Sequence, residues 1–501
     1  MPGDVVAGFS VALVLIPQAL AYAQLAGLPP HHGLFAAALP ALAAAAVASS
    51  PYLQTGPTAV TSLLTFGALG TLAAPGSEAY VGLALLLAVL VGLVRLAAGL
   101  LRAGVAAYLL SPPMLMGFVP AAAILIVASQ LPAAVGAAAP EGGVLERGAW
   151  ALAHPGSWEV ASLILSLATV VLVLGAGRLH VLFPGVLVAA GLGLAYSAVV
   201  GYEGPAVGAV PSGLPPLSVD LPWREAPSLL VPAAVIAIVG FAEPAAIARR
   251  FAALERRRWD ADREFASQGV ANVVAGLSGG FPVGGSFSRS SLNRLAGART
   301  RWSGAVTGLV VLAFLPFTWI VSPLPSAVLA AVVIAAVVSL IRVAPMLRLF
   351  RYSRLQFGVA ATTFALTLAL APRVERAVVI GVVLAVAVHL WRELSLEVAS
   401  SASGDTLHLI PSGVLWFGTA RRLEDAFLTH LAEHGGARRL AVHLDRLGRI
   451  DLTGALALQG LLQDARAAGL DVEVVDVRPR WRGLVARVIE REDDPVGGAI
   501  G

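Results

Sequence analysis

Long apolar runs separated by short polar loops fill the first four-fifths of the chain. They lie near 5–25, 33–49, 56–69, 79–101, 105–133, 158–177, 181–200, 229–247, 268–280, 301–321, 324–341, 356–371 and 374–392, with a further short helix expected from residue 286. A bilayer requires about 20 apolar residues per helix, and counting the two short segments as spans gives about fourteen. The pattern predicts an α-helical polytopic membrane domain over residues 1–395.

The pattern changes after Arg392. Short strands are expected at 406–410, 414–417, 440–444 and 472–477, alternating with helices at 420–434, 452–468 and 481–490. Strands alternating with helices indicate a small α/β domain, which we place at residues 404–495. Asp451 lies at a strand-to-helix turn, where an ordinary N-cap is the expected role.

One stretch, residues 279–293, interrupts the apolar pattern with glycines, hydroxyls and Arg289. Pro282 and the glycines block a helix before Ser286, and Ser286 or Ser288 is expected to cap the helix that follows. A helix that starts inside the membrane points its positive end into a cavity, where an anion is the natural partner. The alternative is a polar re-entrant loop whose arginine reaches the headgroups.

A second stretch, residues 54–64, has the same design. Pro57 suits the first position of a helix. Each stretch also follows an apolar helix interrupted by a proline, Pro17 in one case and Pro244 in the other, at nearly equal separations. Corresponding broken helices in two halves of a membrane protein point to a transport site. We therefore expect two repeats, residues 1–205 and 226–395.

Composition narrows the class of protein. The 501 residues are 57% hydrophobic and 13% charged, with mean hydropathy +0.82, which excludes an ordinary soluble protein. The absence of cysteine excludes disulfides, thiolate nucleophiles and Cys-type metal sites, and we expect no cofactor. The net charge of +4 does not indicate nucleic-acid binding, because the arginines lie between hydrophobic segments.

Arginines occur in alternate loops, which predicts the orientation in the inner membrane. Positively charged loops are cytoplasmic, so both termini are expected inside, with the first helix retained rather than cleaved as a signal peptide. The arginines assigned to this side are Arg95, Arg102, Arg178, Arg249, Arg250, Arg256, Arg257, Arg258, Arg263, Arg294, Arg299, Arg301, Arg342, Arg348, Arg351 and Arg354.

Three polar residues near the helix-breaking prolines are candidates for the site. Gln18 and Tyr22 fall one turn apart on one face of the first helix; a structural bond from Gln18 to the backbone is the alternative. Glu243 precedes Pro244 in apolar surroundings, which favour the neutral form of a carboxyl group. It is either a coupling group or a structural residue bonded to nearby backbone.

Several motifs resemble the sulfate permease (SulP) family of anion transporters, in particular its bacterial members. They are Ile16-Pro17-Gln18-Ala19-Leu20-Ala21-Tyr22-Ala23, Thr55-Gly56-Pro57-Thr58-Ala59-Val60 and Pro282-Val283-Gly284-Gly285-Ser286-Phe287-Ser288-Arg289-Ser290. The C-terminal part resembles a STAS domain, with Asp451-Leu452-Thr453-Gly454 at its helix start. The resemblance covers nearly the whole chain.

The resemblance implies fourteen spans in two inverted seven-helix repeats. A core domain of spans 1–4 and 8–11 would move against a gate domain of spans 5–7 and 12–14, and a homodimer is implied. It also implies a set of residues that bind the anion and one that couples its transport to H⁺ or Na⁺. The anion-binding residues would be Gln18, Tyr22, Thr58, Phe287, Ser288 and Arg289, and the coupling residue Glu243.

We therefore predict a secondary transporter of a small anion, namely a dicarboxylate such as fumarate, bicarbonate or sulfate. Proton-coupled symport by alternating access is the expected mechanism; Gln24, where many bacterial relatives carry glutamate, takes up no proton. An anion channel or a chloride/bicarbonate exchanger is the alternative. A nucleobase permease fits less well, because such sites use carboxylates where this chain has Ser288 and Arg289. An enzyme is not expected, since the soluble domain has no nucleophile–base set.

Overall fold

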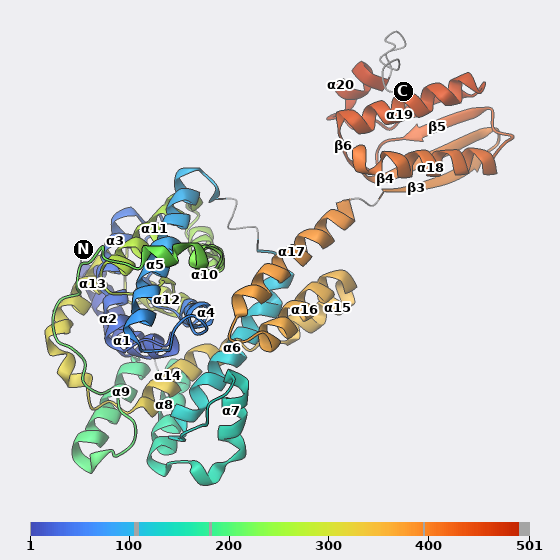
Figure 1. Cartoon of the computed structure of the whole chain (residues 1–501). Coiled ribbons are helices and arrows are strands. Elements are labelled where there is room, and N and C mark those ends of the chain that lie inside the picture. Colours follow the sequence, from blue (N-terminus) through green and yellow to red (C-terminus); the bar gives the residue numbers. More distant parts are fainter. Residues whose placement is uncertain (1, 105–109, 180–182, 394–395, 490–501) are drawn as a thin grey trace. The chain divides into compact units, whose positions relative to one another are not determined.

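The computed structural model describes residues 2–104, 110–179, 183–393 and 396–489 (Figure 1). The chain divides into two compact units, Met1–Ala385 and Val386–Gly501, each described by itself. The first unit is helical and the second combines a sheet with helices.

The fourteen segments expected from the sequence correspond to helices or pairs of consecutive helices in the described residues. Within the described residues, seven helices are long and apolar enough to cross a membrane, and shorter apolar helices accompany them. The α-helices of this unit are α1 (Pro2–Leu25), α2 (His31–Ala37), α3 (Leu39–Val47), α4 (Ala59–Leu69), α5 (Glu78–Leu100), α6 (Pro112–Ala134), α7 (Val144–Ala153), α8 (Val160–Leu179), α9 (Gly185–Tyr196), α10 (Ala226–Leu254), α11 (Ala261–Leu277), α12 (Phe287–Leu295), α13 (Trp302–Phe314), α14 (Ser326–Val337), α15 (Ala344–Tyr352), α16 (Arg354–Ala369) and α17 (Val374–Glu393).

Two details differ from the prediction. Helix α1 continues through Pro17 and α10 continues through Pro244, although both helices were expected to be interrupted. Neighbouring helices in a membrane domain satisfy the backbone groups that a proline frees, so the helix persists. Helix α7 also forms between the apolar runs expected near 105–133 and 158–177, and its Gly148 lies against the backbone of Ala128 in α6. The predicted start of the fifth span, near residue 105, lies outside the described residues.

The two half-helix segments, residues 54–64 and 279–293, meet in the interior. Strand β1 (Thr55–Gly56) pairs antiparallel with β2 (Gly284–Gly285), and all four residues are buried. A Cβ at Gly285 would lie 2.6 Å from Leu53 Cδ1, and one at Gly284 would lie 3.3 Å from the carbonyl oxygen of Gly240. Side chains at these two positions would press against Leu53 and against α10, which favours glycine at both.

Buried polar side chains hold this crossing in place. Arg95 of α5 is fully buried and donates to the carbonyl oxygens of Ile236, Ala237 and Val283 at 3.1, 3.0 and 2.9 Å. Asn272 of α11 donates to the Val283 carbonyl at 3.0 Å and accepts from its N–H at 2.9 Å. The assignment of Arg95 to the cytoplasmic loops was therefore wrong. Its guanidinium group supplies several donors that satisfy carbonyls inside the domain.

The C-terminal unit is an α/β domain, as expected. Its sheet runs β3 (Leu396–Ser403), β4 (Thr406–Leu415), β5 (Arg439–His443) and β7 (Asp471–Val475), with β6 (Leu447–Ile450) paired to β4. Strands β3 and β4 are antiparallel and the other pairs are parallel. Helices α18 (Phe417–Glu433), α19 (Leu452–Ala467) and α20 (Arg482–Leu484) complete it.

Three findings refine the prediction for this unit. Asp451 is the N-cap of α19, where Oδ1 accepts from the N–H of Gly454 at 2.7 Å. The two strands expected around Pro411 form one strand, β4, whose register shifts between Gly413 and Val414. Strands β3 and β6 were not predicted, and β3 precedes the expected boundary at residue 404.

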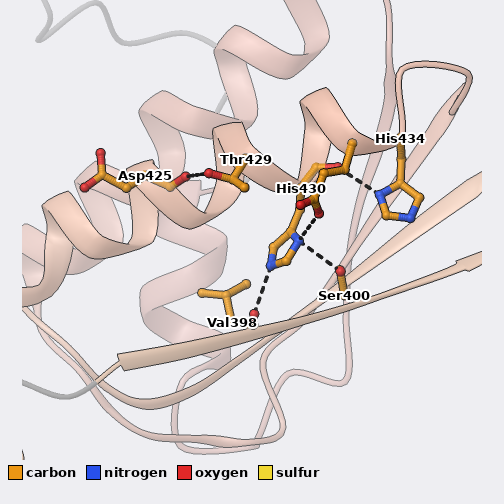
Figure 2. A network of polar contacts seen from close by, with 7 residues as sticks. Val398, Ser400, Asp425, Thr429, His430 and His434 are labelled. Atoms are coloured by element: carbon orange, nitrogen blue, oxygen red, sulfur yellow. Dashed lines mark hydrogen bonds and ion pairs between the residues drawn. The ribbon is translucent and has the colours of Figure 1, made fainter.

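A histidine links the missed strand β3 to helix α18 (Figure 2). His430 Nε2 lies 3.1 Å from the Val398 carbonyl oxygen and its Nδ1 lies 3.0 Å from Ser400 Oγ. Both partners belong to β3. The imidazole therefore fastens the edge strand to the helix that covers it.

Candidate functional site

A cavity of about 450 Å³ lies in the helical unit next to the crossing of the two half-helix segments. One wall comes from α1 and α12 and includes Ser10, Gln18, Ser288 and Arg289. The opposite wall comes from α8, α9 and α14 and is mostly apolar. Among the residues proposed from the sequence, Gln18, Ser288 and Arg289 line this cavity.

Arg289 is the charged group at the cavity. It lies in the first turn of α12, and its side chain is only 1% exposed. Its Nη2 donates to the Pro57 carbonyl oxygen at 2.9 Å, and its Nη1 donates to Gln18 Oε1 at 3.4 Å. Its Nε has no partner among the described residues. The guanidinium group thus joins α12 to the start of α4 and to α1 while one donor stays available.

The start of α12 is capped by another helix. Glu243 of α10 accepts a hydrogen bond through Oε1 from the N–H of Phe287 at 2.9 Å. Ser286 is the N-cap residue, but its side chain caps nothing; its hydroxyl lies 3.2 Å from that of Ser288. The expected hydroxyl cap was therefore wrong, because a carboxylate from α10 supplies the acceptor. Negative charge at this position is favoured by the positive end of the helix.

The start of α4 is capped within its own segment. Thr58 is the N-cap, and it forms a capping box with Thr61. The two hydroxyls lie 2.9 Å apart, and the N–H of Thr58 donates to Thr61 Oγ1 at 3.3 Å. Pro57 was expected at the first helical position but lies one residue before the N-cap, so its carbonyl is free to accept from Arg289.

Tyr22 and Phe287, the remaining residues of the proposed set, are not part of the cavity wall. Tyr22 is buried in α1, one turn beyond Gln18. The ring of Phe287 is 40% exposed and lies beneath Arg250, whose guanidinium carbon is 5.0 Å from the ring centroid. Near the site, Phe287 contributes its backbone N–H, which donates a hydrogen bond to Glu243.

Sequence reasoning missed two kinds of residue at the site. Arg95 and Asn272 hold Val283, the residue before β2, and belong to no local motif. An arginine within an apolar run was nevertheless a signal that its charge is used inside the domain. The residues of the opposite wall, such as Phe183, Val332 and Ala336, are apolar. Nothing in their sequence distinguishes them from other membrane-helix residues.

A polytopic helical unit with two opposed helix starts and a buried arginine at a cavity defines an integral membrane protein of the anion-transporter class. The sequence profile of the Sulfate permease family matches residues 1–363, and that of the STAS domain matches residues 398–491. The chain belongs to the sulfate permease family and carries a C-terminal STAS domain.

Curated relatives and solved structures agree with this assignment. A probable sulfate transporter of Mycobacterium tuberculosis is 36% identical over 383 residues, covering 74% of this chain and 67% of the relative. A sodium-independent sulfate anion transporter of Bos taurus is 31% identical over 515 residues, covering 95% and 83%.

Two solved structures share the fold. The murine Solute Carrier 26 family member A9 anion transporter in the inward-facing state has a TM-score of 0.87 at 20% identity, covering 97% of this chain and 87% of that one. The transmembrane domain of the cyanobacterial bicarbonate transporter BicA has a TM-score of 0.66 at 25% identity, covering 77% and 97%. The fold class expected from the sequence is confirmed.

Proposed function

We propose that this protein is a secondary transporter of a small oxyanion, with sulfate as the first candidate, and that the anion binds at the cavity between Gln18, Ser288 and Arg289. The observation that carries the proposal is the buried Arg289 at the cavity wall, with one guanidinium donor unpartnered among the described residues. Curated relatives from bacteria and mammals are named as sulfate transporters, which supports sulfate over a dicarboxylate.

The physical argument rests on the cost of burying a charge. Arg289 has only neutral hydrogen-bond partners, the Pro57 carbonyl and the Gln18 amide oxygen. A buried guanidinium group is stabilised far more by an anion that accepts bidentate hydrogen bonds than by neutral oxygens. An oxyanion in the cavity supplies that acceptor, and exposed Ser288 adds a hydroxyl donor. The starts of α4 and α12 add favourable dipoles.

The remaining members of the proposed anion-binding set support these contacts. Thr58 holds the start of α4 through its capping box, and Phe287 provides the N–H that fixes α12 to Glu243. Tyr22 extends the buried polar face of α1 beyond Gln18. In this proposal they position the groups that touch the anion.

Alternating access fits the composition of the two walls. The polar wall belongs to helices assigned to the core, and the apolar wall of α8, α9 and α14 belongs to helices assigned to the gate. Movement between the walls would expose the anion to one side at a time. The polar wall carries the binding groups with it, so the anion site stays intact during that movement.

We further propose that Glu243 couples the anion to H⁺. Its carboxylate already occupies the positive end of α12, where it competes electrostatically with a bound anion. Protonation removes that negative charge and lets the anion bind beside it. The alternative, a purely structural cap, predicts uptake that is indifferent to a proton gradient. Uptake that depends on a Na⁺ gradient instead of a H⁺ gradient would contradict the proposed role of Glu243.

The decisive assay is uptake by purified protein in proteoliposomes. Labelled sulfate, bicarbonate, fumarate and chloride would be offered with inward H⁺ or Na⁺ gradients. We expect saturable sulfate uptake that an inward H⁺ gradient accelerates. Bicarbonate is the second candidate, because the BicA transmembrane domain shares the fold at 25% identity. Non-saturating flux without a coupling ion would instead indicate a channel.

The proposal also covers the oligomeric state, the orientation of the termini and the role of the STAS domain. We propose a homodimer with both termini cytoplasmic and a STAS domain outside the transport path. Strand β3 pairs with β4 along eight residue pairs, so a soluble fragment of the STAS unit needs to begin before Leu396 rather than at residue 404. Such a fragment is expected to fold without binding sulfate.

A further inference from the structure

A second cavity, of about 490 Å³, lies in the helical unit and shares no lining residue with the anion cavity. Three connections form its walls: the segment between α3 and β1, the turn between α10 and α11, and the loop between α12 and α13. Two of these connections carry five of the arginines that predict the cytoplasmic side, namely Arg256, Arg257, Arg258, Arg299 and Arg301. The cavity therefore opens on the face expected to be cytoplasmic.

The charge of this cavity is strongly positive. Its lining includes five arginines, namely Arg257, Arg258, Arg263, Arg299 and Arg301. Glu255 is the carboxylate in the lining, and it already accepts a hydrogen bond from the Tyr52 hydroxyl and lies 3.5 Å from Arg294 Nε. Its negative charge is thus compensated from outside the cavity, and the five guanidinium groups face a concave space together.

Two of the five arginines have a structural role, but they donate to backbone carbonyls, which do not neutralise their charge. Arg263 Nε donates to the Val47 carbonyl at 2.7 Å, and Arg301 Nη1 donates to the Ala48 carbonyl at 3.0 Å, so both secure the end of α3. Arg257, Arg258 and Arg299 are exposed. Within the described ranges, no carboxylate forms an ion pair with the guanidinium groups of these three. Positive charge therefore remains available to an anionic ligand.

Size and aromatic lining narrow the ligand class. The volume falls in the range of about 300–1,000 Å³ that is typical of sites for organic molecules, and it exceeds what a bare tetrahedral oxyanion fills. Tyr52, Phe251, Trp259 and Trp302 contribute aromatic surface to the wall. Guanidinium forks match phosphate oxygens bidentately, while aromatic rings contact an organic remainder. We propose that this cavity binds a phosphate ester, either an anionic phospholipid headgroup or a soluble organic phosphate.

The position of the cavity connects such a ligand to the crossing of the half-helix segments. Asn293 of α12 donates to the Tyr52 carbonyl at 3.1 Å and to Ser303 Oγ at 2.8 Å, which ties the cavity walls to α12. Tyr52 in turn lies three residues before β1. A ligand bridging these connections would brace the ends of both segments. This regulatory consequence rests on the proposed anion site, whereas binding of the phosphate ester does not.

The test measures binding by the full-length protein, without transport. Phosphatidylglycerol is titrated into phosphatidylcholine nanodiscs containing the protein, and adenosine monophosphate is titrated in a separate arm, with tryptophan fluorescence and native mass spectrometry as readouts. Arg258→Gln/Arg299→Gln removes two cavity charges from different connections. Arg348→Gln/Arg351→Gln removes two exposed charges from α15, outside the cavity, and serves as the matched control.

We expect saturable binding of at least one probe, weakened about tenfold or more in the cavity variant and less than about twofold in the control, because each lost charged hydrogen bond is worth about a factor of ten. Binding of phosphatidylglycerol alone identifies the lipid as the source, and binding of adenosine monophosphate alone identifies a soluble phosphate. If Arg258→Gln/Arg299→Gln is impaired in folding, judged by gel filtration, Arg257→Gln/Arg258→Gln replaces it. Equal losses in cavity and control variants, or no binding of either probe, overturn the proposal.

Discussion

The two half-helix segments have the same outline but different chemistry at their helix starts. The start of α4 is neutral and self-contained, since Thr58 and Thr61 cap each other. The start of α12 depends on distant parts of the chain, since Glu243 caps it and Arg289 extends from its first turn to Pro57 and Gln18. In the proposed mechanism, the first segment serves as a fixed support and the second carries the charges that respond to ligand and proton.

Removing the cation of the second segment should have the largest effect. Arg289→Ala is expected to lower sulfate uptake by about 10- to 100-fold, because a charge-assisted hydrogen bond is worth about 1.5–3 kcal/mol. Uptake into proteoliposomes measures the effect, and Arg289→Lys should restore only part of it, since an ammonium group lacks the planar fork. Normal uptake by a folded Arg289→Ala protein would show that Arg289 is only a structural contact.

Neutralising the acid of the second segment should separate binding from coupling. In Glu243→Gln, the amide oxygen still accepts from the Phe287 N–H, so the helix start is preserved without its negative charge. We expect sulfate to bind at least as tightly as in the original protein, because glutamine mimics the protonated acid and removes the negative charge beside the anion. Stimulation of uptake by an inward H⁺ gradient should disappear. Retained stimulation would assign Glu243 a purely structural role.

The first segment should respond through stability rather than through charge. Thr58→Ala removes the capping box and should lower the free energy of unfolding by about 1 kcal/mol. Uptake per folded molecule should fall only a few-fold, because no charge is lost. Thermal unfolding in detergent measures the first effect, and Thr58→Ser, which keeps the hydroxyl, is the control. A loss of uptake as large as that of Arg289→Ala would remove the distinction between the two segments.

Sequence reasoning identified both half-helix segments because glycine, proline and hydroxyl residues interrupt runs that are otherwise continuously apolar. The family resemblance implied that Gln18 and Arg289 belong to one site, and the structure brings their side chains within 3.4 Å. The local pattern could not reveal that Glu243 rather than a serine caps α12, because that contact joins residues 44 apart. Arg95 was misplaced for the same reason, since its acceptors lie more than 140 positions away in sequence.

In the STAS unit, strands β3 and β6 could not be predicted from their residue composition. Strand β3 begins with Leu396 but continues into serines and alanines, so its residues have little strand propensity of their own. Pairing with β4 along eight positions defines it. Long-range backbone pairing of this kind leaves only a weak signal in the residues themselves.

The absence of cysteine allows the central claim, that the anion binds beside Ser288 and Arg289, to be tested directly. Ser288→Cys and Ser10→Cys place single thiols on the wall of the same cavity, the first beside Arg289 and the second on α1. The measurement is the rate of thiol modification by a neutral methanethiosulfonate reagent, with and without saturating sulfate. We predict that sulfate slows modification of the Ser288→Cys protein at least fivefold and changes that of the Ser10→Cys protein less than twofold. Equal rates with and without sulfate at Ser288→Cys, in a protein that still transports sulfate, would contradict the account.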